Sequence, residues 1–128
     1  MYYSYIYYCP ISSQPIYVGK GKDRRAWRHF HLDTHLGRLL RKRLRQGYQM
    51  IPQIIRCATE RMALALEVAL IKMFGRSDTG QGTLINYTDG GEGVSGYRHT
   101  PDCIRLIREA RYVYLSRNRI RESHHILS

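Results

Sequence analysis

One carboxylate in this sequence has an unusual setting. Glu67 falls within the most apolar stretch of the chain, and on an α-helix its neighbours three and four positions away are all apolar. These neighbours are Ala63, Leu64, Leu70 and Ile71. An ionised carboxylate on such a surface costs roughly several kcal/mol unless it is paired, protonated or bound to a metal ion. Glu67 is therefore either a structural ion-pair partner of one of the arginines or a ligand for Mg²⁺, which proteins hold with one or two carboxylates, phosphate oxygens and water.

Phenols beside cations form a second group that can do chemistry. If residues 2–9 and 16–18 pair as a β-hairpin, alternate residues share a face, and the phenol of Tyr5 or Tyr7 lies near Tyr17. Cations follow the second of these segments directly, and a nearby cation favours the ionised phenol, which can act as a general base. These cations are Lys20, Lys22, Arg24, Arg25 and Arg28.

Three short strands are expected to position these groups. The Tyr- and Ile-rich residues 2–9 and the run 16–18 suit a pleated, half-buried surface, and a Pro- and Ser-containing turn joins them. Gly19 and Gly21 are expected to end the second strand. Residues 48–57 predict a third strand, whose proline favours an edge or an irregular position.

Helices are expected between and after these strands. Residues 24–31 predict a short helix, and Asp33 or Thr34 can cap a second one that stops at Gly47. Residues 60–74 form the most apolar predicted helix, which should pack across the sheet as the core helix.

The second half of the chain is less regular. Residues 75–97 carry many glycines and predict a long loop, and Pro101 opens a last helix that reaches residue 112 or 120. Short strands interleaved with helices predict an α+β layered domain, and the alternative is a mostly helical basic protein.

The net charge points to an anionic partner. Lys and Arg number 21 against 10 Asp and Glu, a balance of +11 that repels itself unless it is screened. Cations gather over residues 20–45 and 98–121, which favours contact with a nucleic-acid backbone over a solvated face. The expected backbone-binding residues are Lys20, Lys22, Arg24, Arg28, Arg41 and Arg45.

Length and composition narrow the class of protein. A chain of 128 residues suits one domain, and no run of about 18 apolar residues is present that could span a bilayer. The first residues lack the pattern of a secretory signal, so a cytoplasmic protein that is neither exported nor membrane-bound is expected. The three cysteines lie far apart, which indicates reduced, mostly buried side chains and argues against a zinc site or a disulfide framework.

A known family shows these features in the same order. The run YIY at residues 5–7, the run PIYVGKGK at 15–22, and then Arg25 and His29 resemble the catalytic module of the GIY-YIG nucleases. In that family a hairpin presents two tyrosines, the next helix supplies an Arg and often a His, and a later helix supplies one Glu, which here is Glu67. The first motif has a tyrosine or serine where the family has glycine, so either Tyr5 or Tyr7 can be the first motif tyrosine, with Tyr5 favoured.

The resemblance covers about residues 3–96 and implies a fold and a reaction. The fold is a small antiparallel three-stranded sheet flanked by helices over residues 1–96, followed by a basic, DNA-contacting helical tail over residues 97–128. The reaction is hydrolysis of a DNA phosphodiester, most readily in duplex DNA, with one Mg²⁺ or Mn²⁺ ion held by Glu67. Asn86 belongs to a Gly-rich segment that resembles the family's Asn-containing loop, where it would orient the metal site, contact nucleic acid or clamp the loop.

The same resemblance implies a role for each site residue. The first motif tyrosine (Tyr5, or Tyr7 in its place) or Tyr17 would activate the water. Arg25 would stabilise charge on the scissile phosphate, and His29 would assist Tyr17 or touch phosphate. The small size is similar to that of freestanding phage and mobile-element members of the family. The alternatives are a basic nucleic-acid-binding protein that keeps the fold without the chemistry, and a structure-specific repair or recombination nuclease.

Overall fold

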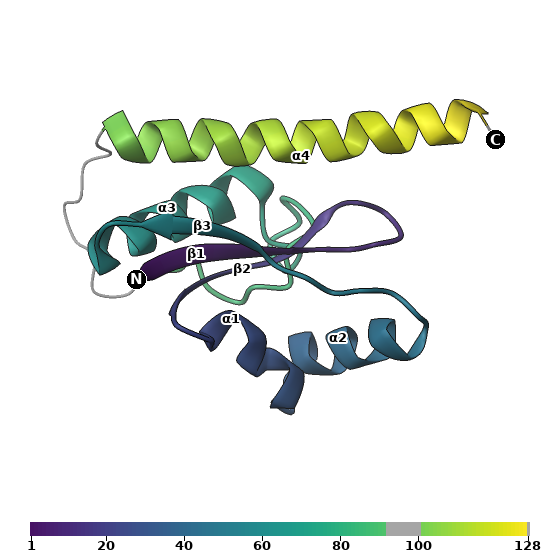
Figure 1. Ribbon diagram of the computed structural model, residues 1–128, viewed down its shortest axis with the longest axis horizontal. Coiled ribbons are helices and arrows are strands. Elements are labelled where there is room, and N and C mark those ends of the chain that lie inside the picture. Colours follow the sequence, from purple (N-terminus) through teal and green to yellow (C-terminus); the bar gives the residue numbers. More distant parts are fainter. Residues whose placement is uncertain (92–100, 128) are drawn as a thin grey trace.

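Three antiparallel strands lie between two layers of helices in the computed structural model, which describes residues 1–91 and 101–127 and, in the last helix, side chains to residue 117 (Figure 1). Strand β1 (Tyr2–Tyr8) is central, with β2 (Pro15–Lys22) on one side and β3 (Gln53–Cys57) on the other. Both neighbours run antiparallel to β1. The expected α+β architecture with a three-stranded antiparallel sheet is therefore confirmed.

Each face of the sheet is covered by its own set of helices. On one face lie α1 (Arg25–Arg28), the short 3-10 helix η1 (His29–His31) and α2 (His35–Arg45). On the other face lie α3 (Glu60–Phe74) and α4 (Pro101–Leu127), with α4 packed along α3 (Figure 1). Among the described residues, no helix has the length and apolar content needed to cross a membrane.

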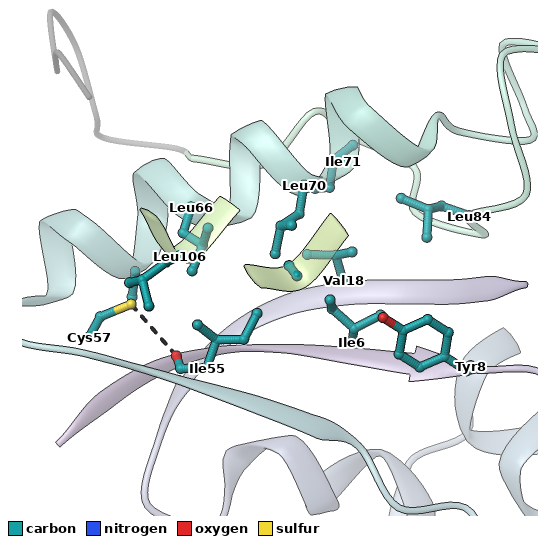
Figure 2. Close-up of a cluster of buried hydrophobic side chains, with 12 residues drawn as sticks. Ile6, Tyr8, Val18, Ile55, Cys57, Leu66, Leu70, Ile71, Leu84 and Leu106 are labelled. Carbon is teal, nitrogen blue, oxygen red and sulfur yellow. Dashed lines mark hydrogen bonds between the residues drawn. The ribbon is translucent and has the colours of Figure 1, made fainter. Parts of the chain in front are cut away.

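Alternation along the central strand divides the interior into two clusters. Even-numbered residues of β1 face α3, and Ile6 packs there with Val18, Leu66 and Leu70 in the larger apolar core (Figure 2). The Ser4 hydroxyl, fully buried on this face, donates to the Ala63 carbonyl of α3 at 2.6 Å. Since a buried hydroxyl requires a partner, this bond ties the core helix to the middle of the sheet.

The first half of α4 belongs to the same core. Cys103, Leu106 and Ala110 are buried, and Leu106 lies beside Leu66 of α3 (Figure 2). Further along, the guanidinium of Arg117 lies 4.2 Å from the centre of the Tyr8 ring. Residues 103–117, which belong to the expected tail, therefore pack against the sheet domain. The expected boundary near residue 96 lies outside the described residues.

Odd-numbered tyrosines of β1 hold the opposite layer. The Tyr3 hydroxyl accepts the Ala26 N–H at 3.0 Å, and the Tyr7 hydroxyl donates to the Ala26 carbonyl at 2.6 Å. Ala26 is the buried residue of α1, so two phenols from one strand secure both backbone groups of this residue. The short helix is thereby placed over the sheet, which positions its neighbours Arg25 and His29.

The expectation that Gly19 and Gly21 end the second strand is wrong, because β2 continues through both to Lys22. Gly19 pairs with Tyr5 of β1, and a Cβ at position 19 would overlap the Tyr5 phenol. A Cβ at position 21 would lie 3.1 Å from the Tyr3 ring. Glycine within a strand often marks the close approach of another group, and here it leaves space for aromatic rings that lie across β2.

Three other expected boundaries differ from the structure. The third strand begins at Gln53 instead of residue 48, because Pro52 has no N–H to donate to a strand ladder. The helix expected over residues 24–31 divides into α1 and η1, and a Cβ at Gly37 of α2 would collide with backbone carbonyls of this turn. The last helix extends to Leu127.

The helix caps agree with the sequence. Thr34, one of the two residues proposed for the second helix, accepts the Gly37 N–H at 3.1 Å through its hydroxyl. Thr59 accepts the Met62 N–H at 3.1 Å, and α3 spans residues 60–74 as expected. Each hydroxyl satisfies one of the N–H groups that the first turn of a helix leaves unpaired.

Candidate active site

Two tyrosines and a histidine gather on the face of the sheet that carries α1. Tyr5 Oη lies 2.5 Å from Nε2 of His29, which belongs to η1. The ring of Tyr17, from β2, has its centre 5.1 Å from the His29 ring and 6.1 Å from the Tyr5 ring. The hairpin and the short helices thus bring together three residues that the sequence separates by up to 24 positions.

Tyr7 has a different environment from Tyr5. Its side chain is fully buried, and its hydroxyl donates to the Ala26 carbonyl. Burial, followed by the neighbouring Tyr3, raises the pKa of the Tyr7 phenol above its ordinary range. Of the two tyrosines that the sequence left open, Tyr5 is hydrogen-bonded to His29, whereas Tyr7 secures α1.

Glu67 approaches the same cluster from α3. Its neighbours Ala63, Leu70 and Ile71 are buried, while Glu67 itself is half-buried and accepts the Gly91 N–H through Oε1 at 2.9 Å. The Glu67 carboxylate raises the pKa of both the Tyr5 and Tyr17 phenols, although burial is the larger cause in each case. The carboxylate therefore lies within electrostatic range of both phenols.

A glycine turn holds Glu67 in place. Gly90 and Gly91 have φ of 77° and 70°, a left-handed conformation that side chains disfavour. A Cβ at Gly90 would lie 2.6 Å from Glu67 Oε1, and a Cβ at Gly91 would overlap the Val68 side chain. Only glycine at both positions allows the loop to approach α3 and to donate its N–H to the carboxylate.

A cluster of ion pairs supports this turn. The Arg76 guanidinium donates to both carboxylate oxygens of Asp78, at 2.9 and 2.6 Å, and to Asp89 at 2.9 Å. Asp89 immediately precedes Gly90, so Arg76 connects the end of α3 to the glycine turn. We call Arg76 and Asp89 the loop clasp, because the pair restrains the segment that contacts Glu67.

Arg25 is coupled to three members of the cluster. Its positive charge lowers the pKa of the Tyr5 and Tyr17 phenols and of the His29 imidazole. For both phenols burial outweighs this effect, so that the net pKa shift is upward. The expectation that nearby cations leave a tyrosine ionised is therefore wrong for the folded chain, since desolvation penalises the phenolate more than Arg25 stabilises it.

His29 is shifted towards its neutral form. Burial, followed by the charge of Arg25, lowers the pKa of the imidazole below its ordinary value. A neutral imidazole with its proton on Nδ1 has an acceptor at Nε2, and the Tyr5 hydroxyl lies at hydrogen-bonding distance from that atom. The pair can therefore pass a proton from the phenol to the ring.

Asn86 lies beside strand β2. Its side-chain oxygen accepts the Val18 N–H at 3.1 Å, and its amide nitrogen donates to the Val18 carbonyl at 2.8 Å. The next contact along the same edge is from the Ile85 N–H to the Ile16 carbonyl, at 2.7 Å. Asn86 is buried and its side chain bonds to β2 as a neighbouring strand would. These bonds fit the expected role of clamping the Gly-rich loop.

The cations expected to bind nucleic acid do not share one face. Lys20 forms an ion pair with Glu60 of α3 at 2.8 Å, and Lys22 lies over the Tyr2 ring. Arg41 donates to the carbonyls of Phe30 and Leu32 at 2.9 Å each, which braces the turn before α2. Of the expected backbone-binding residues, Arg24, Arg28 and Arg45 are exposed on the α1 and α2 side.

The donor atoms around Glu67 suit a hard cation. A carboxylate whose one oxygen is fixed by a backbone N–H offers oxygen ligands, which Mg²⁺ and Mn²⁺ prefer. Among the described residues no group of three or more His, Cys, Asp or Glu side chains gathers to form a metal site. Glu67 is the residue of this cluster that would hold such an ion through its carboxylate.

Several contributors to the site carry no local sequence signal. Gly90, Gly91 and the loop clasp lie in a glycine-rich segment whose composition predicts irregular structure and nothing about which side chain it contacts. His35 and Tyr87 line a cavity next to Tyr17. Only the folded chain brings them to the site, because the contacts span tens of residues.

Comparison with known proteins assigns neither a family nor a function to this chain. A scan of protein-family models and searches of curated proteins and of solved structures found no match to this chain.

Proposed function

We propose that this protein is a metal-dependent endonuclease that hydrolyses phosphodiester bonds of DNA, with a GIY-YIG-like catalytic module. The observation that carries the proposal is the convergence of Tyr5, Tyr17, His29 and Glu67 from four separate elements, with Arg25 coupled to the first three. A proton acceptor, a cation and a hard-metal ligand at one site are the groups that phosphoryl transfer needs. A protein that only binds DNA has no use for this combination.

Water activation is assigned to the Tyr5–His29 pair and Tyr17. A free phenolate is disfavoured because burial raises the pKa of both phenols. Tyr5 can instead pass its proton to His29 Nε2 while it receives one from the attacking water, so no buried phenolate needs to accumulate. The lowered pKa of His29 keeps the ring ready to accept at neutral pH.

Arg25 is assigned to the phosphate. The residue is exposed, yet its charge acts on both phenols and on the imidazole. A guanidinium presents a planar fork of donors that matches the oxygens of a phosphate. We assign to it the stabilisation of the charge that develops on the scissile phosphate.

Glu67 is assigned to hold the metal ion, Mg²⁺ or Mn²⁺. When bound, such an ion supplies Lewis-acid polarisation of a phosphoryl oxygen. The Gly91 N–H fixes one carboxylate oxygen, and the loop clasp restrains the turn that presents this N–H. The chain thereby orients the carboxylate before substrate arrives.

DNA binding is supported by charge. The net charge of +11 favours association with a polyanion, and exposed arginines lie on α1, α2 and α4. Contacts with α4 would involve Arg108 and Arg111, because Arg105 pairs with Glu109 at 3.0 Å. If six to ten phosphates are contacted, affinity falls by about 10³ to 10⁵ between 50 and 200 mM salt.

The decisive experiment is cleavage of supercoiled plasmid by the purified chain at low salt, with Mg²⁺ and with EDTA, beside Glu67→Gln. Glu60→Gln is the matched control, since Glu60 is on the same helix but is exposed and pairs with Lys20. We expect Mg²⁺-dependent nicking or linearisation by the wild type and by Glu60→Gln, and none by Glu67→Gln. Gel shifts should show that Glu67→Gln still binds DNA. Full cleavage by that variant, or bound but uncut DNA for the wild type, would overturn the assignment.

A further inference from the structure

A small cavity opens beside the tyrosine and histidine cluster. It has a volume of about 210 Å³ and is lined by residues of β2, η1, α2, the η1–α2 turn and the loop after α3. Its aromatic and imidazole side chains are Tyr17, His29, His35 and Tyr87, and Leu32 and Ile85 supply apolar surface. Tyr17 and His29 belong both to this cavity and to the candidate active site, so a group bound here is held next to the reacting phosphate.

The lining favours a flat, aromatic occupant. Four ring side chains in the wall of one small cavity provide faces for stacking, and the aliphatic residues exclude water. Pockets for drug-sized ligands measure about 300–1,000 Å³, so this smaller space suits one ring system and not a whole nucleotide. The Tyr87 side chain is 71% exposed at the cavity, where a stacked ring would cover it.

The surrounding charge places a phosphate beside such a ring. Arg25 acts electrostatically on Tyr17 and on His29, the two residues shared by cavity and active site. A nucleotide with its phosphate at Arg25 can therefore direct its base towards the cavity.

We propose that this cavity binds one unpaired nucleobase of the DNA, from the nucleotide next to the scissile phosphate. The inference rests on the proposed function and specifies its substrate class. Because a base inside a continuous duplex must first be unstacked, the preferred substrate is DNA that already carries an unpaired nucleotide at the cleavage position, such as a bulge, a flap or a branch.

The test uses binding of an oligonucleotide duplex with one unpaired 2-aminopurine in a bulge, measured by the fluorescence of that base. The Glu67→Gln chain is used in EDTA, so that binding is measured without cleavage. We expect quenching of the bulged 2-aminopurine as it stacks, and little change when the same base is paired within the duplex. Tyr87→Ala in the same background should remove the quenching and weaken binding to the bulge about 5- to 100-fold.

Matched variants keep the result interpretable. Tyr112→Ala is the control, since Tyr112 is 70% exposed on α4 and should leave the quenching unchanged. Leu32→Trp places a ring at the cavity wall and should also prevent entry of the base. Equal quenching in Tyr87→Ala, Leu32→Trp and the parent would overturn the base pocket.

Failure of the two proposals can be distinguished. A wild-type chain that cuts plasmid but does not quench bulged 2-aminopurine remains a nuclease without this pocket. A chain that quenches through Tyr87 but never cuts retains the base pocket and loses the proposed catalytic function.

Discussion

Two single-atom deletions should separate the proposed catalysis from the stability of the fold. Tyr5→Phe and Tyr7→Phe each remove one hydroxyl from the same face of β1, two residues apart. The Tyr7 hydroxyl donates to the Ala26 carbonyl at 2.6 Å from a fully buried ring, whereas the Tyr5 hydroxyl contacts half-buried His29. The first change should therefore act mainly on folding and the second mainly on the reaction.

The size of each effect follows from the partner that is left behind. Tyr7→Phe takes a partner from a buried carbonyl, which costs about 1–3 kcal/mol of the free energy of unfolding. Tyr5→Phe takes a partner from an imidazole nitrogen of a side chain that is only half-buried, so the cost is about 0.5–1.5 kcal/mol. Loss of a positioned proton-transfer group should lower kcat by about 10²–10⁴ in Tyr5→Phe, with kcat unchanged in Tyr7→Phe.

The assay combines urea unfolding, followed by circular dichroism, with plasmid nicking at saturating DNA under conditions where every variant is folded. Far-ultraviolet spectra of both variants should match the wild type before kinetics are compared. The reasoning is refuted if folded Tyr7→Phe loses activity while Tyr5→Phe retains it. Equal losses of activity in both folded variants would also contradict the separate roles of the two tyrosines.

Three further predictions follow from the packing around the site. Gly19→Ala places a methyl group against the Tyr5 phenol and should destabilise the chain by about 1–3 kcal/mol in urea unfolding as well as reduce cleavage; unchanged stability would show that Tyr5 can move away at little cost. Asp89→Asn weakens the loop clasp with Arg76 and should raise the Mg²⁺ concentration needed for half-maximal cleavage, with Asp33→Asn, an exposed carboxylate paired elsewhere, as the control; identical Mg²⁺ curves would show that the clasp does not position the metal ligand. Burial raises the pKa of several phenols, to about 12 for Tyr8, so the folded chain retains protons that the unfolded chain has lost, and stability should fall as the pH rises above about 10. Absorbance at 295 nm should show the phenols with a raised pKa ionising only as circular dichroism reports unfolding, whereas their ionisation with an intact circular dichroism spectrum would contradict this prediction. The phenols with a raised pKa are those of Tyr5, Tyr7, Tyr8 and Tyr17.

Local patterns in the sequence predict the elements that carry the site. The alternation of residues 2–9 predicts a strand, the threonines before α2 and α3 predict their caps, and the apolar neighbours of Glu67 single out that carboxylate. These features depend on residues only a few positions apart, so the side-chain periods of strands and helices are enough to predict them. Composition likewise determines the net charge and therefore the class of partner.

Only the tertiary structure decides between residues that the local pattern treats alike. Tyr5 and Tyr7 have the same strand parity, and their roles separate because one hydroxyl reaches His29 and the other reaches Ala26, 24 and 19 positions away. Gly19 has the appearance of a strand terminator, yet it remains in the strand because a phenol from β1 fills the space over it.

The setting of Glu67 shows the same division. Its apolar helix neighbours are evident from spacing, but the N–H that it accepts comes from Gly91, 24 positions away in a glycine-rich loop. The protonation state of the Tyr5 and Tyr17 phenols could not be predicted from the sequence either. The sequence shows the nearby cations, which lower the phenol pKa, but not the burial, which raises it by more. Desolvation is a property of the packed interior, so it is decided only when distant segments close over the side chain.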